Sequence, residues 1–175
     1  LDNPYGLSPD SPLEIAYVVG GAGAYTDIGM QIAISLKEEI DNGLVTLYLV
    51  AGIKEDVINS YQTFKQKQFP KSNSIQIIGS IHLFDYFQQF TALMSHIHLL
   101  WTKPSELVFY SALGIPIIMT NPLGPQEEAN RDWVLETGAG TDQYISKYTN
   151  LWLMNRLNTK ELSRMAYAGW SKGIR

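Results

Sequence analysis

Short apolar segments alternate with amphipathic or polar ones along most of this chain, and this alternation restricts the fold more than any single motif. The apolar segments have the length of buried strands and occupy Leu13–Val19, Val45–Val50, Ser74–Ile78, His96–Trp101 and Ile115–Met119. The segments between and after them predict helices over Ile28–Ile40, Glu55–Phe69, Leu83–Met94, Pro104–Leu113 and Gln126–Thr137. Parallel strands need a crossover connection, which is usually a helix. The sequence therefore predicts an α/β fold with a parallel sheet and helices on both faces.

The two ends of the chain depart from this pattern. Residues 1–12 contain three prolines and one glycine without periodicity, which indicates a linker or lead-in. Residues 13–175 are expected to form one domain, in which residues 142–170 are helical. The chain starts at Leu1 without a signal-peptide pattern and stops at Arg175 without an evident finish. We interpret it as a piece of a longer protein.

Composition argues against several classes of protein. Hydrophobic residues make up 45% of the 175 residues and charged residues 17%, which is not the composition of a disordered chain. The net charge is −4 and no basic cluster is present, so we expect no nucleic-acid partner. Because the sequence has no cysteine, disulfides, thiolate nucleophiles and Cys-based zinc sites are excluded. No apolar run reaches the roughly 18 residues of a membrane-spanning helix.

Ligands of parallel α/β sheets bind outside the carboxyl ends of the strands, so the loops that follow the strands are the candidate sites. The first such loop contains Gly20, Gly21, Ala22 and Gly23. Glycines let a backbone approach a phosphate closely, and the helix that follows favours an anion. A tight turn without a ligand is the alternative. NAD is disfavoured, because the second strand ends at Val50 without the acidic residue that dinucleotide-binding folds place there, and no P-loop for ATP is present.

The loop after the fourth strand contains Thr102, Lys103, Ser105 and Glu106. Two hydroxyls, a first helical turn with free N–H groups and the Lys103 ammonium together outline an anion site. Glu106 can instead accept hydrogen bonds from ribose hydroxyls. Simple helix capping by Thr102 or Ser105 explains the same residues without a ligand.

The remaining signals are weaker. Gln126 and Glu127 open a helix and can bind sugar hydroxyls, or they form a solvated helix start that the dipole favours. His82 follows a strand in the ligand-facing zone. His96 and His98 alternate on one face of a strand, but no further ligands lie nearby in sequence, so we expect no metal site.

Four motifs carry a resemblance to a known family: TKPSEL at 102–107, GIPII at 114–118, PQEEAN at 125–130 and ETGAG at 136–140. Their order and spacing resemble the C-terminal, donor-binding half of GT-B glycosyltransferases, in the group of the peptidoglycan N-acetylglucosaminyltransferases and the plant monogalactosyldiacylglycerol synthases. The resemblance covers most of residues 13–141. It implies a Rossmann-like sheet that forms one half of a GT-B fold.

The same resemblance implies that a nucleotide-sugar, with UDP as its nucleotide, binds to the strand-end loops. The base would lie against Gly79–Phe84, which includes Ser80, His82 and Phe84. The diphosphate would meet the glycine loop and the helix after Thr102, and the donor sugar would meet Gln126 and Glu127. The glutamate that binds ribose in many relatives falls on Phe109 here. Either Glu106 takes this role or the nucleotide binds differently.

The expected function is transfer of the donor sugar to an unknown acceptor, with inversion and without a metal or other cofactor. The acceptor domain, which usually supplies the catalytic base, is missing from this chain, so no catalytic residue is assigned. The resemblance places the protein in the cytoplasm, with any membrane contact made through the missing domain. A sugar-nucleotide epimerase of related fold and a non-catalytic nucleotide-binding module are the alternatives.

Overall fold

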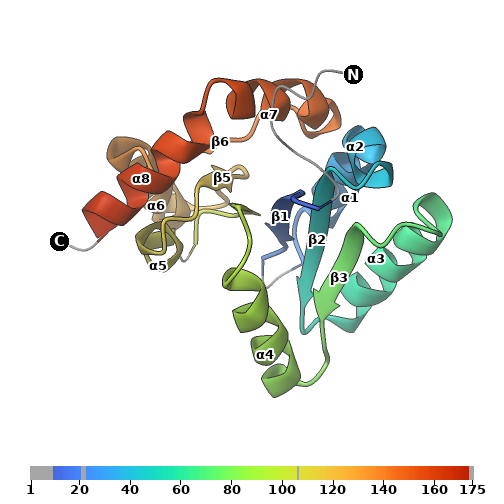
Figure 1. The fold of residues 1–175 in the computed structure, drawn as a ribbon. Coiled ribbons are helices and arrows are strands. Elements are labelled where there is room, and N and C mark those ends of the chain that lie inside the picture. Colours follow the sequence, from blue (N-terminus) through green and yellow to red (C-terminus); the bar gives the residue numbers. More distant parts are fainter. Residues whose placement is uncertain (1–9, 21–22, 106, 174–175) are drawn as a thin grey trace.

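The computed structural model describes residues 10–20, 23–105 and 107–173 of the chain (Figure 1). Its centre is a six-stranded sheet in the order β3-β2-β1-β4-β5-β6, and every pairing is parallel. In chain order the strands are β1 (Leu13–Val18), β2 (Val45–Gly52), β3 (Ile75–Gly79), β4 (Leu99–Thr102), β5 (Ile117–Met119) and β6 (Gly140–Asp142). The predicted Rossmann-like parallel sheet is confirmed.

Helices connect the strands and cover the sheet. They are α1 (Thr26–Ser35), α2 (Lys37–Asp41), α3 (Glu55–Gln68), α4 (Leu83–Met94), α5 (Leu107–Ala112), α6 (Pro125–Thr137), α7 (Thr149–Asn158) and α8 (Glu161–Gly173), with the short 3-10 helix η1 (Ser146–Tyr148) before α7. Figure 1 shows α3 and α4 on opposite sides of β2 and β3. Within the described residues, no helix combines the length and the apolar character that crossing a bilayer requires.

Several sequence predictions of elements need correction. The predicted strand over His96–Trp101 begins only at Leu99, and residues 142–145, predicted to be helical, lie in β6 and in the loop that follows it. The predicted helix over Ile28–Ile40 is interrupted at Leu36, which separates α1 from α2. The predicted helix from Pro104 begins instead at Leu107, because Pro104 and Ser105 lie in a bend. Strand β6 was missed, since its residues Gly-Thr-Asp carry no apolar signal and only its pairing with β5 makes it a strand.

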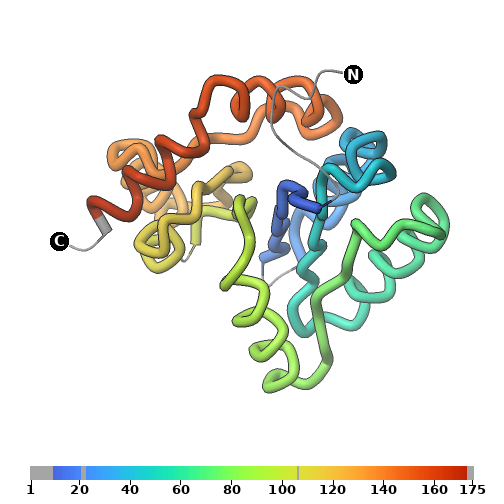
Figure 2. The backbone as a smooth tube through the Cα atoms, viewed as in Figure 1, coloured from blue at the N-terminus to red at the C-terminus, as the bar shows by residue number. Residues whose placement is uncertain are grey.

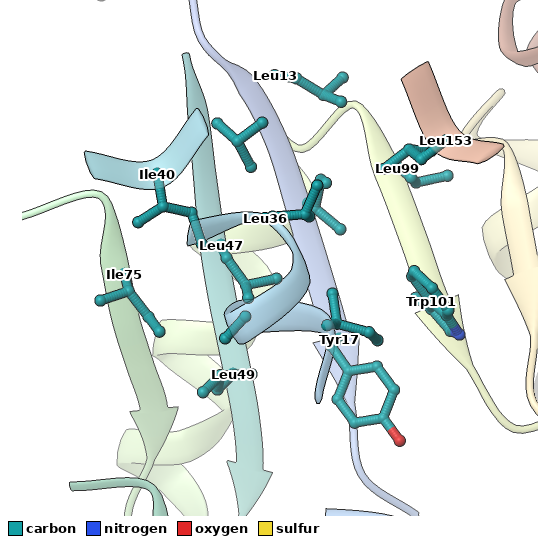
Figure 3. Packing of buried hydrophobic residues seen from close by; sticks show 14 of the residues in the cluster. Leu13, Tyr17, Leu36, Ile40, Leu47, Leu49, Ile75, Leu99, Trp101 and Leu153 are labelled. Atoms are coloured by element: carbon teal, nitrogen blue, oxygen red, sulfur yellow. The ribbon is translucent and has the colours of Figure 1, made fainter. Parts of the chain in front are cut away.

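One face of the sheet carries the largest part of the core. Side chains from alternate positions of the strands, such as Tyr17, Leu47 and Trp101, lie beneath α1, α2 and α3 on one half and beneath α7 on the other. Figure 3 shows Leu36 and Ile40 above β1 and β2, and Leu153 above β4. Strands β1, β2, β4 and β5 are largely buried on both faces and mostly apolar, which explains why the sequence predicted them.

The opposite face is covered by α4, α5 and α6. Leu93 and Ile97 pack there against Leu100, and Leu107 and Val134 pack against β5. The C-terminal helices join the two regions, as Figure 2 shows: α7 runs beside α1, and α8 runs beside α5. This arrangement leaves the carboxyl edge of the sheet to the strand-end loops.

Candidate functional site

The strand order reverses between β1 and β4, which makes the ends of these two strands the place where an open α/β sheet binds ligands. Val18 at the end of β1 pairs with Thr102 at the end of β4. The loops that start at Gly20 and at Lys103 are therefore neighbours. The structure brings these two predicted loops together, and the loop after β5 joins them.

Lys103 connects all three loops. Its stem lies on the backbone of Gly20, so that a Cβ added there would be 2.7 Å from both Lys103 Cδ and Cε. Its Nζ lies 2.5 Å from Glu127 Oε1 at the start of α6. Both side chains are largely buried, with exposed fractions of 15% for Lys103 and 17% for Glu127. A larger residue at position 20 would push the flexible end of the lysine side chain aside.

Glu127 is held at both carboxylate oxygens, because Oε2 accepts a hydrogen bond from Leu123 N at 2.9 Å. Partial burial acts to raise the pKa of Glu127. The hydrogen bonds from Lys103 and Leu123 N, together with the Lys103 charge, outweigh that effect and lower the pKa below its usual value. The carboxyl group is therefore ionised at neutral pH.

Two residues that sequence reasoning did not single out support the loop after β4. Asn130 on α6 donates hydrogen bonds to the carbonyls of Pro104 and Ser105. Thr120 N donates to Thr102 O at 2.9 Å, while the Thr120 hydroxyl is buried without a hydrogen-bond partner in the described structure. Asn130 belongs to the PQEEAN motif, and this membership is the sequence feature that could have identified it as a residue of the site.

The loop after β1 is also a tight turn. Gly23 N donates to Gly20 O at 2.7 Å, and Gly23 has a φ of 75°, which favours glycine. Thr26 Oγ1 donates to Gly23 O at 2.8 Å, so it braces the turn rather than capping α1 from the N-cap position, which Tyr25 occupies. These contacts agree with the interpretation of the loop as a tight turn, and its role in binding an anion stays a prediction. Gly21 and Ala22, which were also predicted site residues, lie outside the described residues.

Ser105 helps to line a hollow of about 390 Å³. Its walls are Leu107, Val108, Phe109 and Tyr110, all from α5. Phe109 is 64% exposed. The predicted ribose-binding position therefore presents an aromatic ring, and the other candidate for that role, Glu106, lies outside the described residues.

Among the described residues, no hydrogen bond or ion pair links the predicted base-binding residues to Lys103, Gly20 or Glu127. Ser80, His82 and Phe84 follow β3, an edge strand that β2 and β1 separate from β4. His82 N donates to Ser80 Oγ at 3.1 Å, and Phe84 is 71% exposed at the start of α4. Gln126 is exposed beside Glu127.

His96 and His98 lie just before β4 rather than within it, so the predicted alternation of the two on one strand face is wrong, and both have structural partners. Glu14 N donates to His98 Nδ1 at 3.1 Å, and the His96 ring lies against Tyr48 at 5.8 Å between ring centroids. Among the residues that the structure describes, no three histidine or acidic side chains are grouped as metal ligands.

No protein-family model matches the chain, and neither does any curated protein. Several solved structures share its fold. Acinetobacter baumannii MurG matches with a TM-score of 0.69 and 18% identity, over 97% of this chain and 48% of MurG. The Streptomyces nogalater glycosyltransferase SnogD matches with a TM-score of 0.56 and 17% identity, over 100% of this chain and 42% of SnogD.

A structure described as a putative epimerase also shares the fold. A putative UDP-N-acetylglucosamine 2-epimerase from Listeria monocytogenes matches with a TM-score of 0.58 and 15% identity, over 93% of this chain and 40% of that protein. The chain thus spans less than half the length of these proteins. The likeness confirms the fold that the sequence resemblance implied, a Rossmann-like domain of the GT-B kind.

Proposed function

We propose that this chain binds a nucleotide-sugar at the ends of β1 and β4, as the donor-binding domain of a glycosyltransferase. The position of Lys103 carries the proposal, since its stem lies on the Gly20 backbone and its ammonium lies where the strand order reverses. A lysine at such a position suits the charge of a diphosphate. The likeness to MurG and SnogD supports sugar transfer, and the match to a Staphylococcus aureus MnaA structure with UDP, at a TM-score of 0.57, supports UDP.

Different strand-end loops would bind different parts of the donor. Lys103 and the glycine loop would bind the diphosphate, Gln126 and Glu127 would accept hydrogen bonds from the donor sugar, and the loop from Ser80 to Phe84 would bind the base. The proposed reaction is a displacement at the anomeric carbon. The acceptor oxygen forms a bond to the anomeric carbon. The bond between that carbon and the diphosphate oxygen breaks at the same time, and the diphosphate leaves with the electron pair. Lys103 would stabilise the negative charge on the leaving group.

The acceptor and the base that takes its proton belong to a second domain in this proposal. The chain alone is therefore expected to bind nucleotide weakly and to turn over no substrate. Epimerisation of the sugar-nucleotide remains the second candidate, because epimerases share the fold. Assays of the full-length protein with a UDP-sugar separate the two, since epimerisation releases an altered UDP-sugar without any acceptor and transfer needs one.

Calorimetric titration of the chain with UDP, GDP, ADP and NAD tests the proposal. We expect selective UDP binding that weakens about tenfold in Lys103→Met, because that variant keeps the stem and loses the charge. Lys67→Met on the exposed face of α3 is the matched control and should bind UDP like the wild type. Equal affinities for all four nucleotides, or equal UDP affinities of the two variants, would contradict the proposal.

A further inference from the structure

The ammonium that would bind the diphosphate already has an anionic partner. Lys103 Nζ and Glu127 Oε1 are 2.5 Å apart, and both side chains are mostly shielded from water. The pKa of Glu127 is lowered, so its carboxyl stays charged at neutral pH. A diphosphate that approaches Lys103 therefore meets a fixed carboxylate at the same nitrogen.

Two anions cannot share this lysine without cost. Two like charges in close proximity repel each other, and the repulsion is stronger in a partly buried site than in water. The contacts of Glu127 offer an alternative to sharing. Its Oε2 keeps the hydrogen bond from Leu123 N when Oε1 is released, and its place in the first turn of α6 favours a carboxylate without a cation.

We propose that the Lys103–Glu127 ion pair is an internal latch that the donor opens. This inference rests on the proposed function. The diphosphate replaces the carboxylate on Lys103, whose stem stays on Gly20, and Glu127 Oε1 then accepts a hydrogen bond from a hydroxyl of the donor sugar. UDP alone opens the latch without giving Glu127 a new partner, whereas a UDP-sugar supplies one. The latch thus favours the intact donor over the nucleotide that remains after transfer.

Three variants separate the latch from a simple charge effect. Glu127→Gln removes the charge, and Glu127→Asp keeps the charge but shortens the side chain so that it no longer reaches Lys103. Glu128→Gln removes a charge from the same turn of α6 at an exposed position where the structure gives no ion pair to Lys103. UDP and UDP-N-acetylglucosamine are the probes, and calorimetry on the 175-residue chain gives both affinities.

We expect Glu127→Gln and Glu127→Asp each to bind UDP about fivefold more tightly than the wild type, the size of one partly exposed ion pair. The preference for the UDP-sugar over UDP should fall in both variants. Glu128→Gln should change UDP affinity less than about twofold, since like charges in the same turn have small effects.

The outcomes distinguish the two proposals. If the wild type binds UDP and neither Glu127 variant binds it more tightly, the latch is wrong while the proposed function stands. A tighter Glu127→Gln together with an unchanged Glu127→Asp shows a charge effect and also overturns the latch. If the wild type and Glu127→Gln both fail to bind UDP at millimolar concentration, the proposed function fails and the latch with it.

Discussion

The side-chain amide of Asn130 donates to the Ser105 carbonyl at 2.6 Å and to the Pro104 carbonyl at 3.2 Å, so one side chain of α6 holds the loop that follows β4. This contact fixes the spacing between Lys103, which lies on that loop, and Glu127, which lies on α6. The geometry of the candidate site therefore depends on a residue that is itself outside the ion pair.

Asn130→Asp should lower stability by about 1–3 kcal/mol, because a carboxylate cannot donate and would face two carbonyl oxygens. Denaturant unfolding measures the change, and UDP affinity should fall with it. Asn59→Asp on the exposed face of α3 is the control and should leave both values near those of the wild type. An Asn130→Asp protein with wild-type stability would show that the two hydrogen bonds do not hold the loop.

Gly20→Ala should cost less than about 1 kcal/mol of stability, because the added Cβ meets the flexible end of Lys103. It should still open the Lys103–Glu127 ion pair by displacing the lysine. Gly140→Ala should cost about 2–3 kcal/mol, since its Cβ would lie 2.5 Å from Ile117 O and 2.7 Å from Val134 Cγ1. Thermal and denaturant unfolding measure the loss of stability in both variants. A larger loss in Gly20→Ala than in Gly140→Ala would contradict the prediction.

The lowered pKa of Glu127 predicts a pH-dependent contribution to stability. A carboxyl with a lower pKa in the folded state stabilises the protein above its unfolded-state pKa, and this contribution disappears as the pH falls through the folded-state pKa. The stability difference between the wild type and Glu127→Gln should therefore be constant near neutral pH and shrink in acid. Unfolding curves of both proteins between neutral pH and about pH 3 measure it. A difference that grows in acid would have the wrong sign.

Arg156→Met should destabilise the packing of α7 against α8 by about 1–3 kcal/mol. Arg156 is 6% exposed, pairs with Glu161, and lies 5.1 Å from the centre of the Tyr144 ring. The loss is moderate because Glu161 keeps access to water. Arg164→Met at an exposed position of α8 is the control, and melting temperatures of the two variants should differ by several degrees, which is about the shift that 1 kcal/mol produces.

Much of the fold was predictable because four of the six strands are largely buried on both faces and mostly apolar. The prediction of α4 over Leu83–Met94 was correct at both ends. Elements that tertiary contacts impose were not predictable in this way. Strand β6 exists through its pairing with β5, and the bend at Pro104 and Ser105 is held by Asn130 from a distant helix.

Several residues of the candidate site were also predictable from the sequence, whereas the contacts between them were not. Gly20 and Lys103 were named from their place after a strand, and Glu127 from its place at the start of a helix. No pattern in the sequence indicates that the lysine stem lies on the glycine and its ammonium on the carboxylate. Those contacts depend on the order of the strands in space. Ser80, His82 and Phe84 were named by resemblance, and their part in binding stays a prediction.

The central position of β1 has a consequence for how the protein folds. Its neighbour β4 comes late in the chain, as the hydrogen bond between Glu14 and His98, 84 residues apart, shows. Closing so long a loop costs entropy before the pairing stabilises it, so this step is slow. The strand ends that carry Gly20 and Lys103 meet only after it. A nucleotide bound between them would slow unfolding and leave the rate of refolding unchanged.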